Sequence, residues 1–372
     1  MKQEKSTQDR IMTNRLDRGF FKYQQEFEEK ALQVLRSGWY VLGREVAAFE
    51  EEFAAWVGAR YSVGLGNGLD ALQLAFRALD IGPGDEVLVQ GNTYIASVMG
   101  ITMNGATPVF VEPDNAYAMD ASTLEEKITE RTKAVLVVHL YGQATPMDQI
   151  CEICRAHGLK LVEDCAQSHG AAYRGKITGT FGDIGCFSFY PSKNLGGFGD
   201  GGAIVTDDKQ LAERIRVYRN YGSEKRYYNK VVGVNSRLDE LQAGLLRVRL
   251  RHMDELTGER QDIAARYLKE LDASKIRLPI LIPDCGHVWH QFVVRSDKRD
   301  GLAEHLDKCG ISTIIHYPIP PHLSEAYRYL GFQEGDFPKT EQLAGEVLSL
   351  PIYTGMTEEE QERVIKAVNA FG

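Results

Sequence analysis

One stretch of the sequence decides the fold: Phe187-Ser188-Phe189-Tyr190-Pro191-Ser192-Lys193-Asn194-Leu195-Gly196-Gly197-Phe198-Gly199-Asp200-Gly201-Gly202. An aromatic strand ends at Pro191, a single lysine follows, and the glycines after it are too dense for a helix or a strand. Lysine forms Schiff bases, and its pKa shifts readily when it is buried. A lone lysine in a glycine turn is usually a solvated charge, so the case for chemistry at Lys193 depends on Asp164, which lies upstream.

Short apolar runs alternate with amphipathic segments on both sides of this stretch. The sequence predicts strands at 61–65, 86–90, 107–111, 134–139, 160–163 and 203–206. It predicts helices at 24–37, 45–57, 70–78, from 95, from 123, and at 147–157, 211–218, 237–255 and 259–271. This alternation is typical of βαβ units around a parallel sheet, so the expected fold class is α/β.

Polar residues follow several of the predicted strands. In parallel sheets, ligands bind outside the carboxyl ends of the strands. This rule places the following groups on one rim, although they lie far apart in the sequence: Asn67-Gly68, Thr93-Tyr94, His139, Asp164 and Gln167.

Four groups near this rim together suit pyridoxal phosphate. That cofactor needs a lysine for its aldehyde and an acid for its pyridinium nitrogen, which Lys193 and Asp164 supply. It also needs a phosphate cup, and the start of a helix at Asn67-Gly68-Leu69 offers free amides near the hydroxyl of Ser188. Tyr94 offers an aromatic ring to cover the cofactor. Each group alone is weak evidence, whereas the set predicts a pyridoxal phosphate site.

The chain resembles the sugar aminotransferases of the DegT/StrS type from about Phe20 to its C-terminus. The motifs that carry the resemblance are Gly66-Asn67-Gly68-Leu69-Asp70-Ala71-Leu72, Glu163-Asp164-Cys165-Ala166-Gln167, the stretch 187–202, and Gly233-Val234-Asn235-Ser236-Arg237-Leu238-Asp239. The resemblance implies the type I aminotransferase fold, in which helices flank a mainly parallel sheet and a smaller C-terminal α/β domain follows. We expect an N-terminal arm at 1–20, a large cofactor-binding domain at 21–257 and a small domain at 258–372.

The resemblance also implies roles for particular residues. Lys193 would hold the cofactor covalently and act as general base, Asp164 would pair with the pyridine nitrogen, and Gln167 would contact the side of the ring that carries the hydroxyl group.

The phosphate would be held by Ser188 and by the backbone of Gly68 and Leu69. The family often has Thr at position 69, so Leu69 can contribute only its amide. Asn235 would reach the phosphate from a second subunit, which implies a homodimer with shared active sites. The usual amino donor of the family is L-glutamate.

Two segments resemble the dTDP-3-keto-6-deoxyhexose 3-aminotransferases: the glycine loop 194–202 and Ala166-Gln167-Ser168-His169-Gly170. The implied reaction transfers an amino group to the C3 keto group of a dTDP-3-keto-6-deoxyhexose. Its product, a dTDP-3-amino-3,6-dideoxyhexose, would serve bacterial glycan or glycosylated metabolite biosynthesis. The candidate substrate-binding residues are His169, Lys225, Tyr227, Arg237, His316 and Tyr317.

Other functions remain as alternatives. One is an aminotransferase that acts on a 4-keto nucleotide sugar. Another is a sugar dehydratase of the same fold, which would carry His where Lys193 stands. A third, of a different class, is a regulator that binds pyridoxal phosphate without catalysis.

Composition narrows the classes of partner. The chain has 372 residues and a net charge of −9, which argues against binding nucleic acid. It has no apolar run of about 18 residues and no secretory signal, and its six scattered cysteines fit a reducing cytoplasm. Cys151 and Cys154 have the spacing of a metal or redox motif but fall on the apolar face of a predicted helix. We therefore expect a cytoplasmic protein with no membrane association and no metal site.

Overall fold

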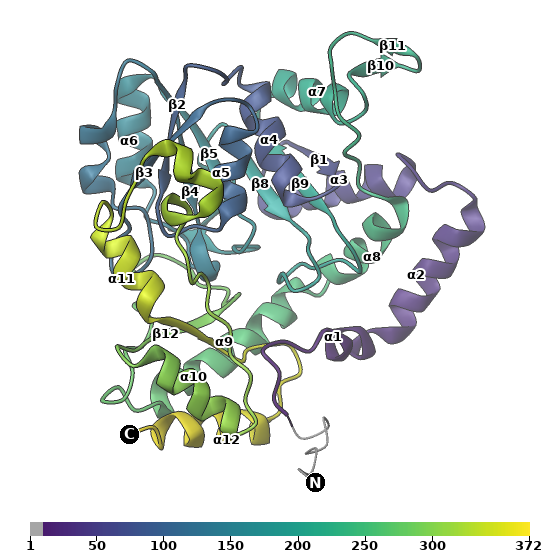
Figure 1. The fold of residues 1–372 in the computed structure, drawn as a ribbon. Helices are drawn as coiled ribbons and strands as arrows, with labels where there is room; N and C mark the ends of the chain where they lie inside the picture. The colour runs from purple at the N-terminus through teal and green to yellow at the C-terminus, as the bar shows by residue number, and fades with distance from the viewer. Residues whose placement is uncertain (1–9) are drawn as a thin grey trace.

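A seven-stranded sheet lies at the centre of residues 10–372, the residues that this computed structural model describes (Figure 1). Its strand order is β1-β9-β8-β5-β4-β2-β3. The strands are β1 (Tyr61–Leu65), β2 (Glu86–Gln90), β3 (Thr107–Val111), β4 (Thr132–Val138), β5 (Lys160–Asp164), β8 (Ile184–Ser188) and β9 (Gly202–Thr206). Neighbouring strands are parallel from β8 to β3, and β9 is antiparallel to both β1 and β8. The sheet confirms the predicted α/β class and every predicted strand within it.

Helices cover both faces of this sheet and continue into the C-terminal part of the chain. They are α1 (Leu16–Lys22), α2 (Gln24–Ser37), α3 (Arg44–Val57), α4 (Gly68–Ala78), α5 (Ile95–Thr102), α6 (Asp148–His157), α7 (Lys209–Tyr218), α8 (Glu240–Leu250), α9 (Met253–Glu270), α10 (Arg299–Lys308), α11 (Pro338–Glu346) and α12 (Glu358–Asn369). One apolar layer joins α4, α5 and α7 to the sheet. On the opposite face, one apolar cluster joins the sheet to α3 and α8, and another joins it to α6. A sheet buried on both faces explains why its strands read as continuous apolar runs.

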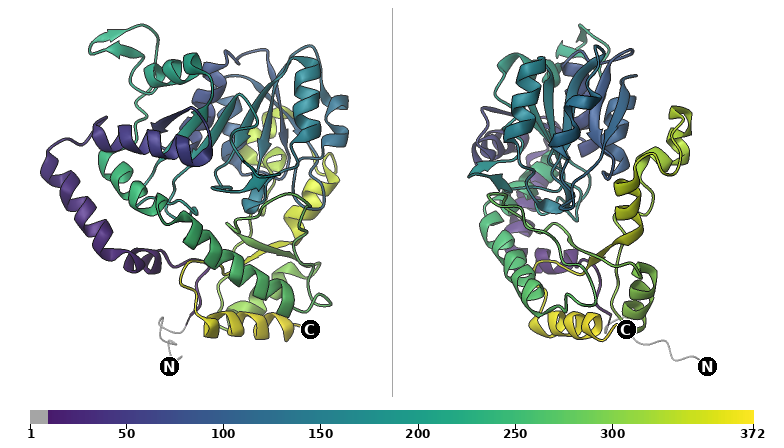
Figure 2. Two further views of the ribbon diagram at one scale, coloured as in Figure 1. Left: turned by 180° about the vertical axis from the view of Figure 1, so that it is seen from behind. Right: turned by 90° about the vertical axis from the view of Figure 1, so that its left-hand side faces the viewer.

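Two helix predictions were wrong. The segment around Thr123 forms only two short 3-10 turns, Ala121–Thr123 and Glu125–Lys127, and β4 follows from Thr132. The long helix expected at 237–255 is divided between α8 and α9, which Figure 2 shows following one another. At the break, the ring of His252 stacks on Tyr23 at 3.8 Å between centroids, and its Nε2 lies 2.9 Å from Glu26.

The C-terminal part has an apolar core of its own. The antiparallel strands β12 (Phe292–Arg295) and β13 (Val347–Leu350) pack with α10, α12 and the second half of α9. Ile11 also packs into this core. The separate core supports the small domain that we propose for 258–372, whose first residues lie within α9. For the expected arm at 1–20, residues 1–9 lie outside the described residues.

Among residues 10–372, no helix combines the length and the apolar character that crossing a bilayer requires.

Candidate active site

The pleat of the sheet determines which strand-end residues face one another. In β5, Val162 packs in the layer that contains α4 and α5, whereas Leu161 packs on the opposite side. Because side chains alternate along a strand, Asp164 lies on the side of Val162. The same reasoning in β8 puts Ser188 on the side of Cys186, which belongs to the same layer. The two predicted site residues therefore emerge on one side of adjacent strands.

Asp164 is held by hydrogen bonds at the carboxyl end of β5, where it is 6% exposed. The hydroxyl of Ser97 donates to its Oδ2 at 2.7 Å, and the amide of Ala166 donates to its Oδ1 at 3.0 Å. Ser97 Oγ also lies 2.7 Å from Thr93 Oγ1. Burial raises the pKa of Asp164, while these two hydrogen bonds and the nearby Lys193 oppose that rise. The result is a buried carboxylate with a fixed orientation.

Lys193 follows β8 in a tight loop. Its backbone amide donates to the carbonyl of Tyr190 at 2.8 Å. A Cβ atom on Gly196 would lie 2.3 Å from the carbonyl oxygen of Pro191, so the loop requires glycine there. Burial lowers the pKa of Lys193 to about 8, and the carboxylate of Asp164 opposes that effect. An amine with this pKa is partly neutral, hence nucleophilic, near neutral pH.

The predicted phosphate cup is formed by the start of α4 and the end of β8. A Cβ atom on Gly68 would lie 2.6 Å from Cβ of Ser188, so glycine is needed for this approach. Asn67 caps the helix by accepting from the amide of Asp70 at 2.8 Å. Among the described residues, the amides of Gly68 and Leu69 have no acceptor. Free amides at the start of a helix, next to a serine hydroxyl, suit an oxyanion.

Gln167 joins the large domain to the C-terminal part of the chain. Its Oε1 accepts from the amide of Tyr141 at 2.6 Å, and its Nε2 donates to the hydroxyl of Tyr317 at 3.0 Å. The ring of Tyr317 lies 5.0 Å from that of Tyr94 between centroids. Tyr94 is 51% exposed. The structure thus brings together three predicted residues, Tyr94, Gln167 and Tyr317.

Three imidazoles lie close enough to Lys193 for its charge to lower their pKa values: those of His169, His290 and His316. Burial and Lys193 lower the pKa of His316 to about 4, and its Nδ1 lies 2.8 Å from Ser349 Oγ. Nδ1 of His290 lies 3.3 Å from Oδ1 of Asn194, the residue that follows Lys193 in the chain. His316 is therefore neutral at pH 7 and lies near Lys193, while its contact with the substrate stays a prediction.

His169 occupies a different place from the rim position expected of it. It has no exposed surface and packs between Phe187 and Phe189, with ring centroids 5.5 and 6.0 Å away. Burial, and to a lesser extent the charge of Lys193, lower the pKa of His169 to about 3, while the backbone of Ser188 opposes this. Its side chain is therefore buried beside these rings rather than exposed at the rim, and a contact with the substrate stays a prediction.

Lys225, Tyr227 and Arg237 lie at or near the hairpin β10 (Ser223–Lys225) and β11 (Tyr228–Asn229), which projects from the body in Figure 1. Tyr227 is 82% exposed. A groove of about 870 Å³ is lined by Tyr227 and Arg237, although not by Lys225. Among residues 10–372, no hydrogen bond or ion pair links these residues to Lys193 or Asp164. Asn235 is likewise exposed, and its backbone forms a bridge to Asn220.

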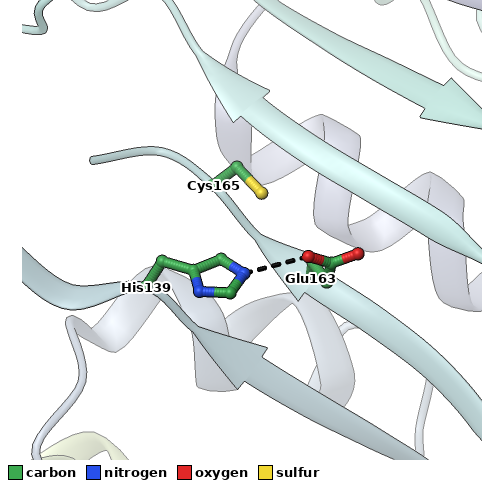
Figure 3. Close-up of side chains that lie close together, drawn as sticks. All are labelled: His139, Glu163 and Cys165. Atoms are coloured by element: carbon green, nitrogen blue, oxygen red, sulfur yellow. Dashed lines mark hydrogen bonds and ion pairs between the residues drawn. The ribbon is translucent and has the colours of Figure 1, made fainter. Parts of the chain in front are cut away.

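Glu163, the neighbour of Asp164, points to the opposite face of the sheet and has a different role. Figure 3 shows it next to His139 and Cys165. Nε2 of His139 lies 3.0 Å from Glu163, and Nδ1 of His139 accepts from the amide of Thr145 at 3.0 Å. The carboxylate also accepts from the amides of Gly179, Phe181 and Gly182 at 2.7, 2.7 and 2.8 Å. These bonds occupy the ligand atoms of His139 and Glu163, so the cluster anchors a loop to β5 rather than offering a metal site.

Sequence reasoning missed Ser97, which orients the carboxylate of Asp164, and the pair formed by Asn194 and His290. Ser97 lies one helical turn after Thr93, shortly after β2 ends. This position near a strand end was the signal by which the sequence could have identified Ser97. His290 comes from the small domain, and nothing local in the sequence connects it to Lys193.

The residues present fit pyridoxal phosphate. An amine with a lowered pKa, a fixed buried carboxylate and a cradle of free amides lie on one side of adjacent strand ends. A Cβ atom at position 68 would fill that cradle. An open aromatic ring at Tyr94 completes the set of groups that the cofactor requires.

Comparison with known proteins agrees with this geometry. The chain is 54% identical, over 94% of its length and 96% of the relative's, to dTDP-3-amino-3,6-dideoxy-alpha-D-galactopyranose transaminase from Aneurinibacillus thermoaerophilus. It is 50% identical, over 93% of its length and 92% of the relative's, to dTDP-3-amino-3,4,6-trideoxy-alpha-D-glucose transaminase from Streptomyces venezuelae.

Solved structures extend the agreement to the fold. DesV of S. venezuelae, solved with a ketimine intermediate, matches with a TM-score of 0.95 and 49% identity over 97% of this chain and 98% of its own. NtdA of Bacillus subtilis, solved with bound PMP, matches with a TM-score of 0.87 and 30% identity over 95% of this chain and 83% of its own.

The model of the DegT/DnrJ/EryC1/StrS aminotransferase family matches residues 22–369, which is nearly the whole chain. The fold, the lysine–aspartate pair and the relatives agree, and the chain belongs to the DegT/DnrJ/EryC1/StrS aminotransferase family.

Proposed function

We propose that this enzyme uses pyridoxal phosphate to transfer an amino group from L-glutamate to the C3 keto group of a dTDP-3-keto-6-deoxyhexose. The observation that carries the proposal is the buried pair of Lys193 and Asp164, which occurs in a chain 54% identical to a named dTDP-3-amino sugar transaminase. The product would be a dTDP-3-amino-3,6-dideoxyhexose.

Lys193 and Asp164 divide the work of the reaction. Pyridoxal phosphate, when bound, supplies an aldehyde that carries the amino group and a ring that accepts electrons from the substrate carbon. Lys193 would hold the cofactor covalently. Its amine, once released, would move a proton from the donor carbon to the cofactor in the first half of the reaction, and from the cofactor to the sugar carbon in the second half. Asp164, held by Ser97, keeps a negative charge opposite the ring nitrogen.

The remaining predicted residues orient the cofactor. Ser188 and the free amides of Gly68 and Leu69 bind its phosphate, Tyr94 covers the ring, and Gln167 contacts the side with the hydroxyl group. Since Gln167 also bonds Tyr317, docking of the small domain and orientation of the ring are linked.

We propose that two chains share each active site. The exposed Asn235 would reach the phosphate bound by the partner, and Lys225, Tyr227 and Arg237 would bind the nucleotide diphosphate there. The groove near the hairpin supports this role, because Arg237 and the aromatic rings of Trp39 and Tyr40 line it. Arginine suits phosphates and aromatic rings suit a base.

Two alternatives predict different behaviour. An enzyme that acts at C4 would share all these cofactor contacts and differ only in where the sugar sits. A regulator would bind the cofactor without turnover, but it would need no lysine with a lowered pKa next to Asp164.

The regiochemistry is tested by offering dTDP-3-keto-6-deoxy and dTDP-4-keto-6-deoxy sugars separately with glutamate. We expect efficient formation of a 3-amino sugar from the first substrate only, identified by NMR and mass spectrometry. Amination of the 4-keto sugar alone would refute the C3 assignment while leaving aminotransfer intact. Binding of the cofactor with no product from either sugar would favour the regulator.

Asp164→Asn should retain cofactor but lose most activity. The substitution keeps the shape and removes the negative charge opposite the ring nitrogen, so we expect the rate to fall by ~10²–10³. Single-turnover absorbance with glutamate measures the effect, and Asp183→Asn, which changes an acid just before β8, serves as the control. A rate near that of the wild type would mean that another group pairs with the nitrogen.

The lowered pKa of Lys193 predicts a pH profile for uptake of pyridoxal phosphate by cofactor-free enzyme. Only the neutral amine attacks the aldehyde, so the rate should rise with pH and level off above about 8. An ordinary lysine would continue to gain reactivity toward pH ~10.4. In Asp164→Asn the plateau should begin at lower pH, because the carboxylate raises the pKa of Lys193. Stopped-flow absorbance measures this profile, and a rate still rising at pH 10 would contradict the assignment.

Sharing of sites between chains is tested by complementation. Lys193→Ala and a severe change such as Asn235→Arg should each inactivate the enzyme. Co-expression of the two variants should restore part of the activity, because some mixed dimers of an isologous pair hold one intact site. Full activity in a monomer, separated by size-exclusion chromatography, would refute the shared site.

A further inference from the structure

A small cavity next to Lys193 is lined by an unusual set of charges. Its volume is about 30 Å³, and Arg15, Arg249 and Arg260 line it together with Lys193. No Asp or Glu is among its lining residues. Arg15 is engaged elsewhere, since it forms an ion pair with Asp17 at 2.7 Å. The other two arginines have no such partner.

Arg249 lies near the glycine loop, with much of its bonding capacity unused. Its Nη1 donates to the carbonyl of Gly196 at 2.7 Å, and its guanidinium lies 5.8 and 5.7 Å from the ring centroids of Phe27 and Phe198. No carboxylate lies within ion-pair distance among residues 10–372. Burial lowers the pKa of Arg249 to about 10.

Arg260 is more deeply buried, at 5% exposure. Its Nη1 donates to the carbonyls of Trp289 at 3.0 Å and Ile352 at 3.1 Å. Its Nε and Nη2 have no recorded acceptor, and this side chain also lacks a carboxylate partner in the described part of the chain. Burial and the nearby Arg249 lower its pKa to about 10, and the more distant carboxylate of Glu259 opposes this only in part.

Two neighbouring guanidinium groups in one cavity repel each other, and a buried charge is costly unless an opposite charge pairs with it. An anion in the cavity would relieve both costs. The cavity has room for about two waters, which corresponds to the two oxygens of one carboxylate. Guanidinium groups bind carboxylates with two parallel hydrogen bonds, and Arg249 and Arg260 each have unused donors.

We propose that Arg249 and Arg260 form a carboxylate site that holds one carboxylate of the amino donor next to Lys193. The proposal rests on the proposed function, which makes a dicarboxylic amino acid the donor. The keto-sugar nucleotide carries no carboxylate, so the site acts in the half-reaction with the donor and not in the half-reaction with the sugar.

The kinetic test measures the two half-reactions separately in Arg249→Gln. Loss of a hydrogen bond to a charged group should raise the KM for glutamate ~10- to 100-fold. The half-reaction of the aminated enzyme with the keto sugar should change by less than about twofold. Arg249→Lys should recover part of the loss, and Arg251→Gln, on the exposed side of the same helical region, is the matched control. Equal losses in both half-reactions would overturn the proposal.

A binding test does not require catalysis. Glutarate, a dicarboxylate without an amino group, should raise the thermal unfolding midpoint of the wild type and of Lys193→Ala. It should leave the midpoint of Arg249→Gln unchanged. An equal rise in all three proteins, or no rise in the wild type, would overturn the site. If glutarate binds as expected but no amino transfer from glutamate is found, the carboxylate site stands and the proposed function fails.

Discussion

The burial of one carboxylate and one amine in the same water-poor region is the constraint on which the rest of the structure depends. Neither charge is stable there alone, because burial raises the pKa of Asp164 and lowers that of Lys193. Each charge partly offsets the effect of burial on the other. The hydroxyl of Ser97 and the amide of Ala166 fix the carboxylate. Both side chains therefore need a rigid support, which the adjacent parallel strands β5 and β8 provide.

The same strand shows how the pleat separates chemistry from architecture. Glu163 and Asp164 are consecutive acids, yet they face opposite sides of the sheet. Glu163 binds three backbone amides and His139, and so fastens the loop that leads into β8. Asp164 faces the layer of α4 and α5 and is available to a ligand. Exchanging their environments would require a register shift of one residue, which the buried faces of the sheet forbid.

Contacts between the two parts of the chain converge on the loop of Lys193. Asn194, the next residue, donates to the carbonyl of Val288 at 2.7 Å and pairs with His290. Gln167, on the sheet side, donates to the hydroxyl of Tyr317 in the C-terminal part at 3.0 Å. The site is thus assembled from the end of a sheet and from a second core. A change in how that core docks would move groups on several sides of the lysine.

The sequence by itself determined the α/β class, the strands of the central sheet, and the roles expected of Lys193, Asp164 and Gly68, because these depend on local apolar periodicity and on compact motifs. It did not predict the break between α8 and α9, where His252 stacks on Tyr23, a residue between α1 and α2 that is distant in the sequence. It placed His169 at the rim, whereas packing against Phe187 and Phe189 buries that side chain. Ser97 and the pair of Arg249 and Arg260 were also missed. Only the tertiary structure decided these features, because each depends on distances between residues far apart in the chain, and no local pattern encodes such distances.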